Sequence, residues 1–295
     1  MGVNTPFFFI FAPQTIPMET DIFDKKWQLI ESKCLIDSTK KVEQPPIALS
    51  LGNKSFPSKN GLGGTKPTWE VFEIPICTYG NFSFIQAPPK SKKTFFVSLL
   101  TAAYLGANNF SGKIKSHRDN RKLLHFDTEQ GSWHSARAFK RAIDMSGIQD
   151  NYFTFALRTL GYKDRIEFIQ YCIQKYQNAG MIVIDGIADL VSDVNDIEQS
   201  NNCVQQLMKW SADYKCHIVT VIHSNFGNDK PTGHLGSFLE KKCETQISLE
   251  VNTVNKDWIS VSCKRSRSFP FENFSFKVND FGLPEIIGDL YDPLK

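Results

Sequence analysis

The sequence lacks several features that mark common protein classes. Its 7 cysteines are an odd number, widely spread and without a C-x-x-C spacing. This argues against a disulfide framework or a cysteine-rich zinc site and favours a reducing cytoplasm. No apolar run approaches the roughly 18 residues of a membrane-spanning helix, and the formal net charge of +3 is too small to indicate a nucleic-acid binder by itself. We therefore expect a cytoplasmic protein with no membrane partner.

The chain is long enough for one large α/β domain. It has 295 residues, of which 41% are hydrophobic. Residues 1–67 show little periodic pattern and end in a run of turn-forming residues, so we predict an N-terminal extension over 1–67 and a principal domain over 68–295. Met18 precedes an acidic amphipathic stretch and is an alternative start of the protein.

Short apolar runs alternate with amphipathic stretches after residue 70. The runs are continuously apolar, as expected for strands that helices cover on both faces. Repeated alternation of this kind predicts a mostly parallel α/β sheet flanked by helices. Three further strands joined by short links predict a C-terminal antiparallel meander. The expected strands are 81–86, 122–127, 152–157, 181–185, 217–222, 246–251, 258–263 and 273–278, and the expected helices are 95–105, 135–145, 164–178 and 197–214.

A candidate phosphate-binding loop follows the first of these strands. It aligns with the pattern G-x-x-x-x-G-K-[ST], in which a lysine reaches the phosphates, a hydroxyl binds Mg²⁺ and backbone N–H groups at a helix start hold anions. Both glycine places are filled by other residues, so a solvated lysine-rich turn is the alternative. The aligned residues are Ala87, Pro88, Pro89, Lys90, Ser91, Lys92, Lys93 and Thr94, with Ala87 and Lys92 at the glycine places.

Two other strands end in acidic residues. Asp185 ends the apolar run 181–185, at the sheet edge where α/β proteins bind ligands, and a carboxylate there can hold the water shell of Mg²⁺. Glu129 follows the strand 122–127 and can polarise a water molecule that attacks a phosphate. For Asp185 the alternative is an ordinary turn after a buried strand.

The order of these motifs resembles the RecA-like ATPases. The resemblance is closest to the plasmid replicative-helicase branch, which is RepA- and DnaB-like, and to its relatives on bacterial mobile elements, some of them labelled AAA-family ATPases or mobilization proteins. It covers roughly residues 70–280. The segments that carry it are Lys93-Thr94, Asp127-Thr128-Glu129-Gln130, Ile184–Leu190, Val221-Ile222-His223 and Gly233-His234-Leu235-Gly236-Ser237.

The resemblance implies a role for each matched residue. It implies ATP and Mg²⁺ as cofactors, with Lys93 on the phosphates, and Thr94 and Asp185 on the metal. Glu129 would be the catalytic carboxylate, and His223 would sense the γ-phosphate at the end of its strand. A histidine bonded to a neighbouring loop is the alternative for His223.

The resemblance also implies an assembly. Residues 224–232 would form a loop facing the central channel of a ring and single-stranded DNA. Lys264 or Arg267, with Arg265 as a competitor, would reach the γ-phosphate of a neighbouring subunit, as relatives deliver a cation in trans. A basic strand end on the surface is the alternative for these residues, and a solvated loop is the alternative to a polynucleotide contact for the basic stretch 113–122.

These inferences predict an ATP-hydrolysing motor from a mobile-element replication or mobilization system. It would act on single-stranded DNA as a homo-oligomeric ring such as a hexamer, together with other replication or mobilization proteins. The missing glycines motivate a rival, a non-hydrolysing nucleotide- or DNA-binding accessory module. A third reading is an ATPase that loads other proteins without touching DNA. Tyr79, Phe82 and Trp133 are near the loop and could stack on adenine, although we expect each to pack in the core.

Overall fold

The computed structural model describes residues 19–36, 39–40, 43–57, 69–106, 113–225 and 229–287. The chain divides into two compact units, 1–44 and 45–295. In the first, α1 (Glu19–Cys34) is a helix that the sequence pattern did not predict. The second unit already contains β1 (Ile47–Pro57), upstream of the boundary that we predicted at residue 67. None of the described helices is long and apolar enough to cross a membrane.

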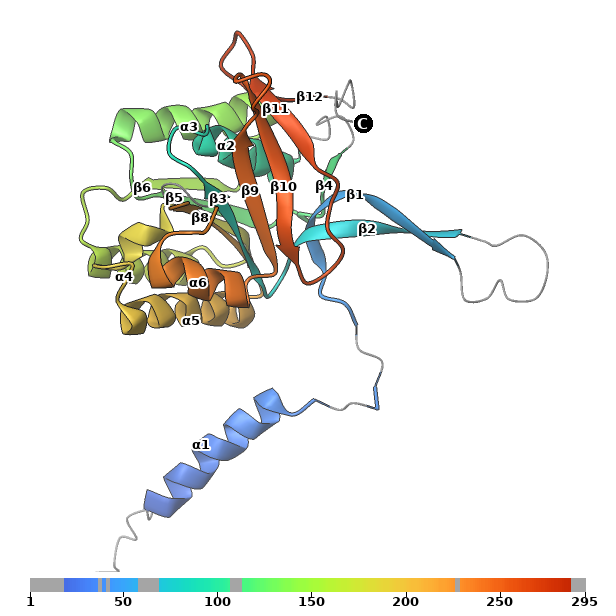
Figure 1. The fold of residues 1–295 in the computed structure, drawn as a ribbon. Coiled ribbons are helices and arrows are strands. Elements are labelled where there is room, and N and C mark those ends of the chain that lie inside the picture. The colour runs from blue at the N-terminus through green and yellow to red at the C-terminus, as the bar shows by residue number, and fades with distance from the viewer. Residues whose placement is uncertain are drawn as a thin grey trace, which may run out of the picture. The chain divides into compact units, whose positions relative to one another are not determined.

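A nine-stranded sheet forms the centre of the second unit (Figure 1). Its parallel part confirms the predicted α/β fold class, and the strands at its end are antiparallel, as predicted. The spatial order is β12-β11-β10-β9-β3-β8-β7-β5-β6. The strands are β3 (Phe82–Ala87), β5 (Lys122–Asp127), β6 (Tyr152–Ala156), β7 (Ala179–Asp185), β8 (His217–His223), β9 (Thr245–Val251), β10 (Trp258–Ser266), β11 (Phe274–Val278) and β12 (Pro284–Ile287).

Helices cover both faces of this sheet (Figure 1). Alternate residues of one strand belong to different hydrophobic clusters: Leu123 packs in the cluster that contains Phe96 and Leu99, and Leu124 in the one that contains Leu207. This two-sided burial explains the continuously apolar strands. The helices are α2 (Lys93–Leu105) and α3 (Ser132–Ser146) on one face, and α4 (Tyr162–Lys175), α5 (Ile197–Asp213) and α6 (Gly233–Lys242) on the other, with a 3₁₀ turn η2 (Ile187–Leu190) after β7.

A second, three-stranded sheet consists of β1, β2 (Trp69–Thr78) and β4 (Ile114–Ser116) in the order β2-β1-β4. The sequence pattern missed these strands because β1 pairs irregularly with β2, with three register shifts, and its buried apolar residues lie only at its start. The strand β4 arises from the basic stretch 113–122. Arg118 and Arg121 in this stretch donate to backbone carbonyls, so these two side chains hold the fold together.

The register of the parallel strands aligns their carboxyl ends. Ala87 of β3 pairs with His223 of β8, and Asp127 of β5 pairs with Asp185 of β7. Because β8 also pairs with β7, all four residues lie along one edge of the sheet. Ligands of α/β proteins bind at this edge.

Candidate functional site

The candidate phosphate loop runs from Ala87, at the end of β3, to the start of α2. Lys92 adopts φ 58° and ψ 31°, and Lys90 adopts φ 65°, so both are in the left-handed region. Glycine adopts this conformation at little cost, whereas other residues are strained by about 1–2 kcal/mol. Lys92 stands at a glycine place of the phosphate-loop pattern. The backbone therefore has a glycine-like conformation at this place without the glycine.

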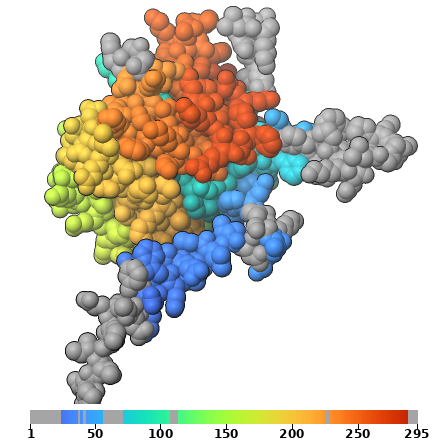
Figure 2. Space-filling model, turned by 60° about the horizontal axis from the view of Figure 1, so that its bottom comes forward, coloured from blue at the N-terminus to red at the C-terminus, as the bar shows by residue number. Residues whose placement is uncertain are grey.

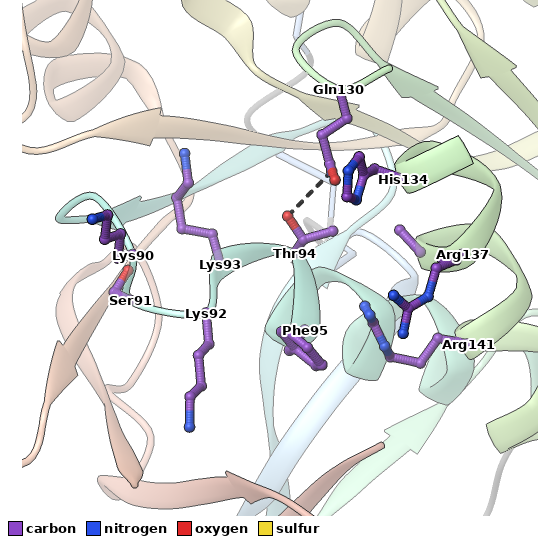
Figure 3. A pocket seen from close by; sticks show the side chains of 11 residues that line it. Lys90, Ser91, Lys92, Lys93, Thr94, Phe95, Gln130, His134, Arg137 and Arg141 are labelled. Atoms are coloured by element: carbon purple, nitrogen blue, oxygen red, sulfur yellow. Dashed lines mark hydrogen bonds between the residues drawn. The ribbon is translucent and has the colours of Figure 1, made fainter. Parts of the chain in front are cut away.

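Side-chain contacts hold this loop. Lys92 Nζ donates to the carbonyl oxygen of Asp257, in the link between β9 and β10, at 3.1 Å. Ser91 Oγ donates to the carbonyl oxygen of Pro88 at 2.7 Å. Lys92 and Lys93 point to opposite sides of the loop (Figure 3).

Lys93 is 9% exposed and lies between two predicted partners. Its Nζ donates to His223 Nε2 at 2.7 Å and lies 3.7 Å from Glu129 Oε2. Since an ammonium group only donates, Nε2 of His223 must accept, which leaves the ring proton of the neutral imidazole on Nδ1. The structure thus brings together three side chains that are far apart in the sequence.

Glu129 lies in the turn after β5, and its Oε1 is 3.6 Å from His223 Nε2. The contact with His223 is the largest influence and lowers the pKa of the Glu129 carboxyl; burial opposes it, and the charge of Lys93 lowers the pKa further. The group is therefore ionised at neutral pH and can accept a proton. Gly186 makes room for this turn: its φ is 109°, and a Cβ there would lie 2.3 Å from Thr128 Oγ1 and 2.8 Å from Glu129 Cγ.

Asp185 is a buried carboxylate, 3% exposed, at the end of β7. Its Oδ2 has no hydrogen-bond partner among the described residues. Burial and the charge of Asp127 raise the pKa of Asp185 to about 7. Thr94 Oγ1, in the first turn of α2, accepts a long hydrogen bond of 3.4 Å from Gln130 Nε2. A carboxylate and a hydroxyl are ligands that suit Mg²⁺, and a cation would supply the partner that Oδ2 lacks. These residues therefore fit the metal that the resemblance implies.

A hollow of about 330 Å³ lies between the phosphate loop and α3 (Figure 3). None of its described lining residues is acidic, and five are lysines or arginines, so it suits a polyanion. We did not assign Phe95, Arg137 or Arg141 to the site from sequence, although the i, i+4 spacing of the two arginines places them on one face of α3. The hollow is lined by Lys90, Ser91, Lys92, Lys93, Thr94, Phe95, Gln130, His134, Arg137, Ala138 and Arg141.

Aromatic and cationic side chains meet at this hollow. The Arg141 guanidinium lies 3.8 Å from the centre of the Phe95 ring and donates to Ser98 Oγ at 3.1 Å. Burial lowers the pKa of Arg141. Trp133 is 63% exposed under the Arg137 guanidinium, so the expected core position is wrong for this residue. Phe82, by contrast, is a core residue as expected.

The three cations of β10 lie away from this site. Arg265 pairs with Gln246 of β9, which pairs with Phe84, three residues before the end of β3. Lys264 Nζ contacts Asp229 Oδ2 at 2.6 Å and Glu250 Oε1 at 3.2 Å.

Arg267 and Arg265 differ in their contacts. Arg267 donates from Nε and Nη2 to the carbonyl oxygens of Cys243 and Lys242, at the C-terminal end of α6, each at 3.0 Å. Arg265 is 62% exposed, and its Nε lies 3.8 Å from Glu240 Oε1. α6 and β10 adjoin on the surface, orange and red in Figure 2. A role of these residues at a neighbouring subunit stays a prediction.

The predicted channel loop 224–232 is partly described, since residues 226–228 lie outside the described ranges. Asn225 N–H donates to the carbonyl oxygen of Lys230, and Ser224 pairs with Pro231. Gln86 Nε2 donates to the carbonyl oxygen of Asp229 at 2.6 Å. The described ends of the loop are thus bonded to each other and to β3.

Comparisons with known proteins agree with this geometry. A model of a family described as "AAA domain" (AAA_25) matches residues 71–229, more than half of the chain. No curated protein matches. The solved ATPase domain of a DnaB-like helicase has 14% identity and a TM-score of 0.53, and the match covers 70% of this chain and 84% of that one. The RadB recombinase has 14% identity and a TM-score of 0.50, with coverage of 71% and 91%.

At 14% identity, the two solved structures establish the fold and no more. The mostly parallel sheet, the helices on both faces and the antiparallel strands after β9 are those of the RecA-like arrangement. The family match spans the phosphate loop, Glu129, Asp185 and His223. The chain therefore belongs to the AAA domain family and has a RecA-like fold.

Proposed function

We propose that this protein binds ATP with Mg²⁺ and hydrolyses the γ-phosphate. The observation that carries the proposal is the meeting of Lys93, Glu129 and His223 beside the buried carboxylate of Asp185. These groups come from four elements of the sheet edge, and their chemistry is that of phosphoryl transfer: a cation, a base, a polar sensor and a metal ligand.

The chain's own residues would divide the work as follows. Backbone N–H groups at the start of α2 and the Lys93 ammonium would hold the phosphates. Thr94 and Asp185 would hold Mg²⁺, which supplies charge neutralisation of the phosphates when bound. Glu129, ionised at neutral pH, would accept a proton from the attacking water. The cationic residues of the hollow beside α3 would attract the nucleotide.

Lys93 is the residue whose partners would change on binding. In the structure its ammonium contacts Glu129 and His223. A phosphate group would compete for the same donors, and the Glu129 carboxylate would then be free to orient water. His223 would follow Lys93 or donate to the phosphate from the end of β8.

We further propose that the protein is a motor that acts as a ring on single-stranded DNA, in a mobile-element replication or mobilization system in the cytoplasm. The resemblance of its motifs to plasmid replicative helicases supports this, as does the placement of the β10 cations away from the chain's own phosphate loop. A cation that acts in trans has to leave its own site free.

Binding and turnover of ATP, measured separately, test the proposal. Lys93→Ala should bind ATP at least tenfold more weakly, because it removes the cation nearest the phosphates. Glu129→Gln should bind ATP but lose roughly 10²-fold or more in turnover. Lys209→Ala, which removes an exposed lysine paired with Asp213 on α5, is the charge-matched control and should behave as wild type.

The outcomes separate the candidate functions. Turnover that single-stranded DNA stimulates supports the motor. Tight ATP binding without turnover favours the non-hydrolysing accessory module. Turnover that ignores DNA, with nucleic-acid binding absent at low salt, favours an ATPase acting on proteins. ATP binding that survives Lys93→Ala would refute the site itself.

A further inference from the structure

Asp127 is a buried acidic residue, 1% exposed, at the end of β5. It pairs in register with Asp185 and precedes Glu129 by two residues. We propose that Asp127 is a positioning residue, which fixes the turn that carries Glu129 and Gln130 for ATP hydrolysis. The inference rests on the function proposed above.

One carboxylate oxygen of Asp127 closes the turn. Its Oδ1 accepts hydrogen bonds from the backbone N–H groups of Glu129 at 3.1 Å and Gln130 at 2.9 Å. Hydrogen bonds to a carboxylate are roughly twice as strong as those between neutral groups. They fix the backbone at Glu129, and thereby the direction in which its side chain leaves toward Lys93 and His223.

The other oxygen reaches the opposite side of the site. Asp127 Oδ2 accepts from Gln130 Nε2 at 3.0 Å, and the same Nε2 lies 3.4 Å from Thr94 Oγ1. Figure 3 shows the contact between Gln130 and Thr94. A single buried carboxylate thus connects the turn that bears the proposed base with the hydroxyl proposed to hold Mg²⁺.

A separate contact ties the same turn to β7. Thr128 Oγ1 lies 3.0 Å from the carbonyl oxygen of Asp185, 2.8 Å from that of Gly186 and 2.9 Å from Asp189 Oδ2. Removing the Asp127 carboxylate therefore leaves the turn attached to the sheet. What is lost is the brace on Glu129 and Gln130, so the expected defect is in turnover and not in ATP binding.

Two substitutions separate these roles. Asp127→Ala removes both acceptors. Asp127→Asn keeps one oxygen for the two backbone N–H groups and alters only the contact with Gln130. We expect Asp127→Ala to lower kcat roughly tenfold to a hundredfold, within the range that a positioned general base contributes. Its Kd for ATP should stay within about threefold of wild type, since Lys93 and the start of α2 are untouched. Asp127→Asn should recover most of the turnover.

A double-mutant cycle distinguishes positioning from general damage. In a Glu129→Gln background, Asp127→Ala should cause no further loss of single-turnover rate, because its effect passes through Glu129. Asp144→Ala, at an exposed position on α3, is the matched control and should keep wild-type turnover. The thermal midpoint of each variant, read by circular dichroism, reports folding, and Asp127→Asn serves if Asp127→Ala does not fold.

The outcomes separate this inference from the proposed function. If wild type turns over ATP and Glu129→Gln does not, but Asp127→Ala keeps full kcat, the positioning role is wrong. The same holds if the alanine variant loses as much again in the Glu129→Gln background, or if asparagine is no better than alanine. If wild type itself shows no turnover, the proposed function fails and this inference fails with it.

Discussion

Lys92 and Asp257 join the phosphate loop to the link between β9 and β10, through a 3.1 Å hydrogen bond from Lys92 Nζ to the backbone carbonyl of Asp257. The lysine that makes this bond has left-handed backbone angles at a place where the phosphate-loop pattern has glycine. The loop therefore replaces the freedom of glycine with a side-chain tether. This relationship bears directly on whether the loop is degenerate or functional.

Replacing Lys92 separates the strain from the tether. Lys92→Ala keeps the left-handed strain and loses the hydrogen bond, whereas Lys92→Gly loses the bond but relieves the strain. We expect the glycine variant to be more stable than the alanine variant by about 1 kcal/mol in urea unfolding. ATP affinity of the glycine variant should stay within a few-fold of wild type. Equal stabilities would mean that the backbone strain at this position is negligible.

Asp185→Asn should stabilise the ligand-free protein at pH 8. The folded-state pKa of Asp185 is raised to about 7 from an ordinary 3.8, so the folded protein binds the proton more tightly than the unfolded chain. Its contribution is fully present below about pH 4 and is lost as pH rises through 7. At pH 8 the neutral amide should raise the free energy of unfolding by on the order of 1–3 kcal/mol, and by less at pH 5.

The same variant should lose its response to nucleotide. Mg²⁺ and ATP together should raise the thermal midpoint of the wild-type protein, because a ligand that binds only the folded state stabilises it. For Asp185→Asn that shift should be absent or much smaller. A variant that is no more stable at pH 8, or one that Mg²⁺ and ATP still stabilise fully, would contradict the role of Asp185.

Arg265 and Arg267 should differ in what they contribute. Arg267 bonds two carbonyl oxygens at the end of α6, so Arg267→Ala should cost about 1–2 kcal/mol of stability. Arg265→Ala, at a 62% exposed position, should change stability by less than about 0.5 kcal/mol. We expect Arg265→Ala to lower turnover nonetheless, since its guanidinium is the more available of the two to a neighbouring subunit.

Mixing two inactive proteins tests the action in trans. Arg265→Ala subunits keep a complete phosphate loop, and Glu129→Gln subunits keep Arg265. If Arg265 completes a neighbour's site, an equimolar mixture should regain part of the ATP turnover that neither variant has alone. A mixture no more active than its components would exclude this role for Arg265. The same mixture made with Arg267→Ala or Lys264→Ala ranks the three cations.

The central sheet was predictable because its strands are covered on both faces. Met181–Ile184 reads as a continuous apolar run for this reason, and the acid after it marks the edge of the sheet. β1 was not predictable because its pairing depends on register shifts with β2, and its exposed half carries polar residues such as Asn53 and Lys54. α6 is short and begins with two glycines in four residues, which hides it from a helix pattern.

The candidate site was partly predictable for a different reason. Lys93 and His223 are 130 residues apart, and their contact follows only from the order of the parallel strands, which the family resemblance implied. The left-handed conformation of Lys92 could not be foreseen, since lysine rarely adopts it. The use of Arg267 to bond the end of α6 depends on tertiary packing, so the sequence pattern offered no signal for it.

His125 should make the protein sensitive to mild acid. It is 1% exposed in β5, where its Nδ1 lies 2.8 Å from the Tyr152 hydroxyl, and burial lowers its pKa to about 3. The unfolded chain, with an ordinary histidine pKa of about 6.5, binds the proton more readily, so stability is full above pH 6.5 and falls toward pH 3. At pH 5 the loss from this residue should be about 2 kcal/mol. His125→Gln, which stays neutral and can still bond Tyr152, should reduce the difference in unfolding free energy between pH 7.5 and pH 5 by that amount. An unchanged difference would show that His125 is not the residue that senses acid.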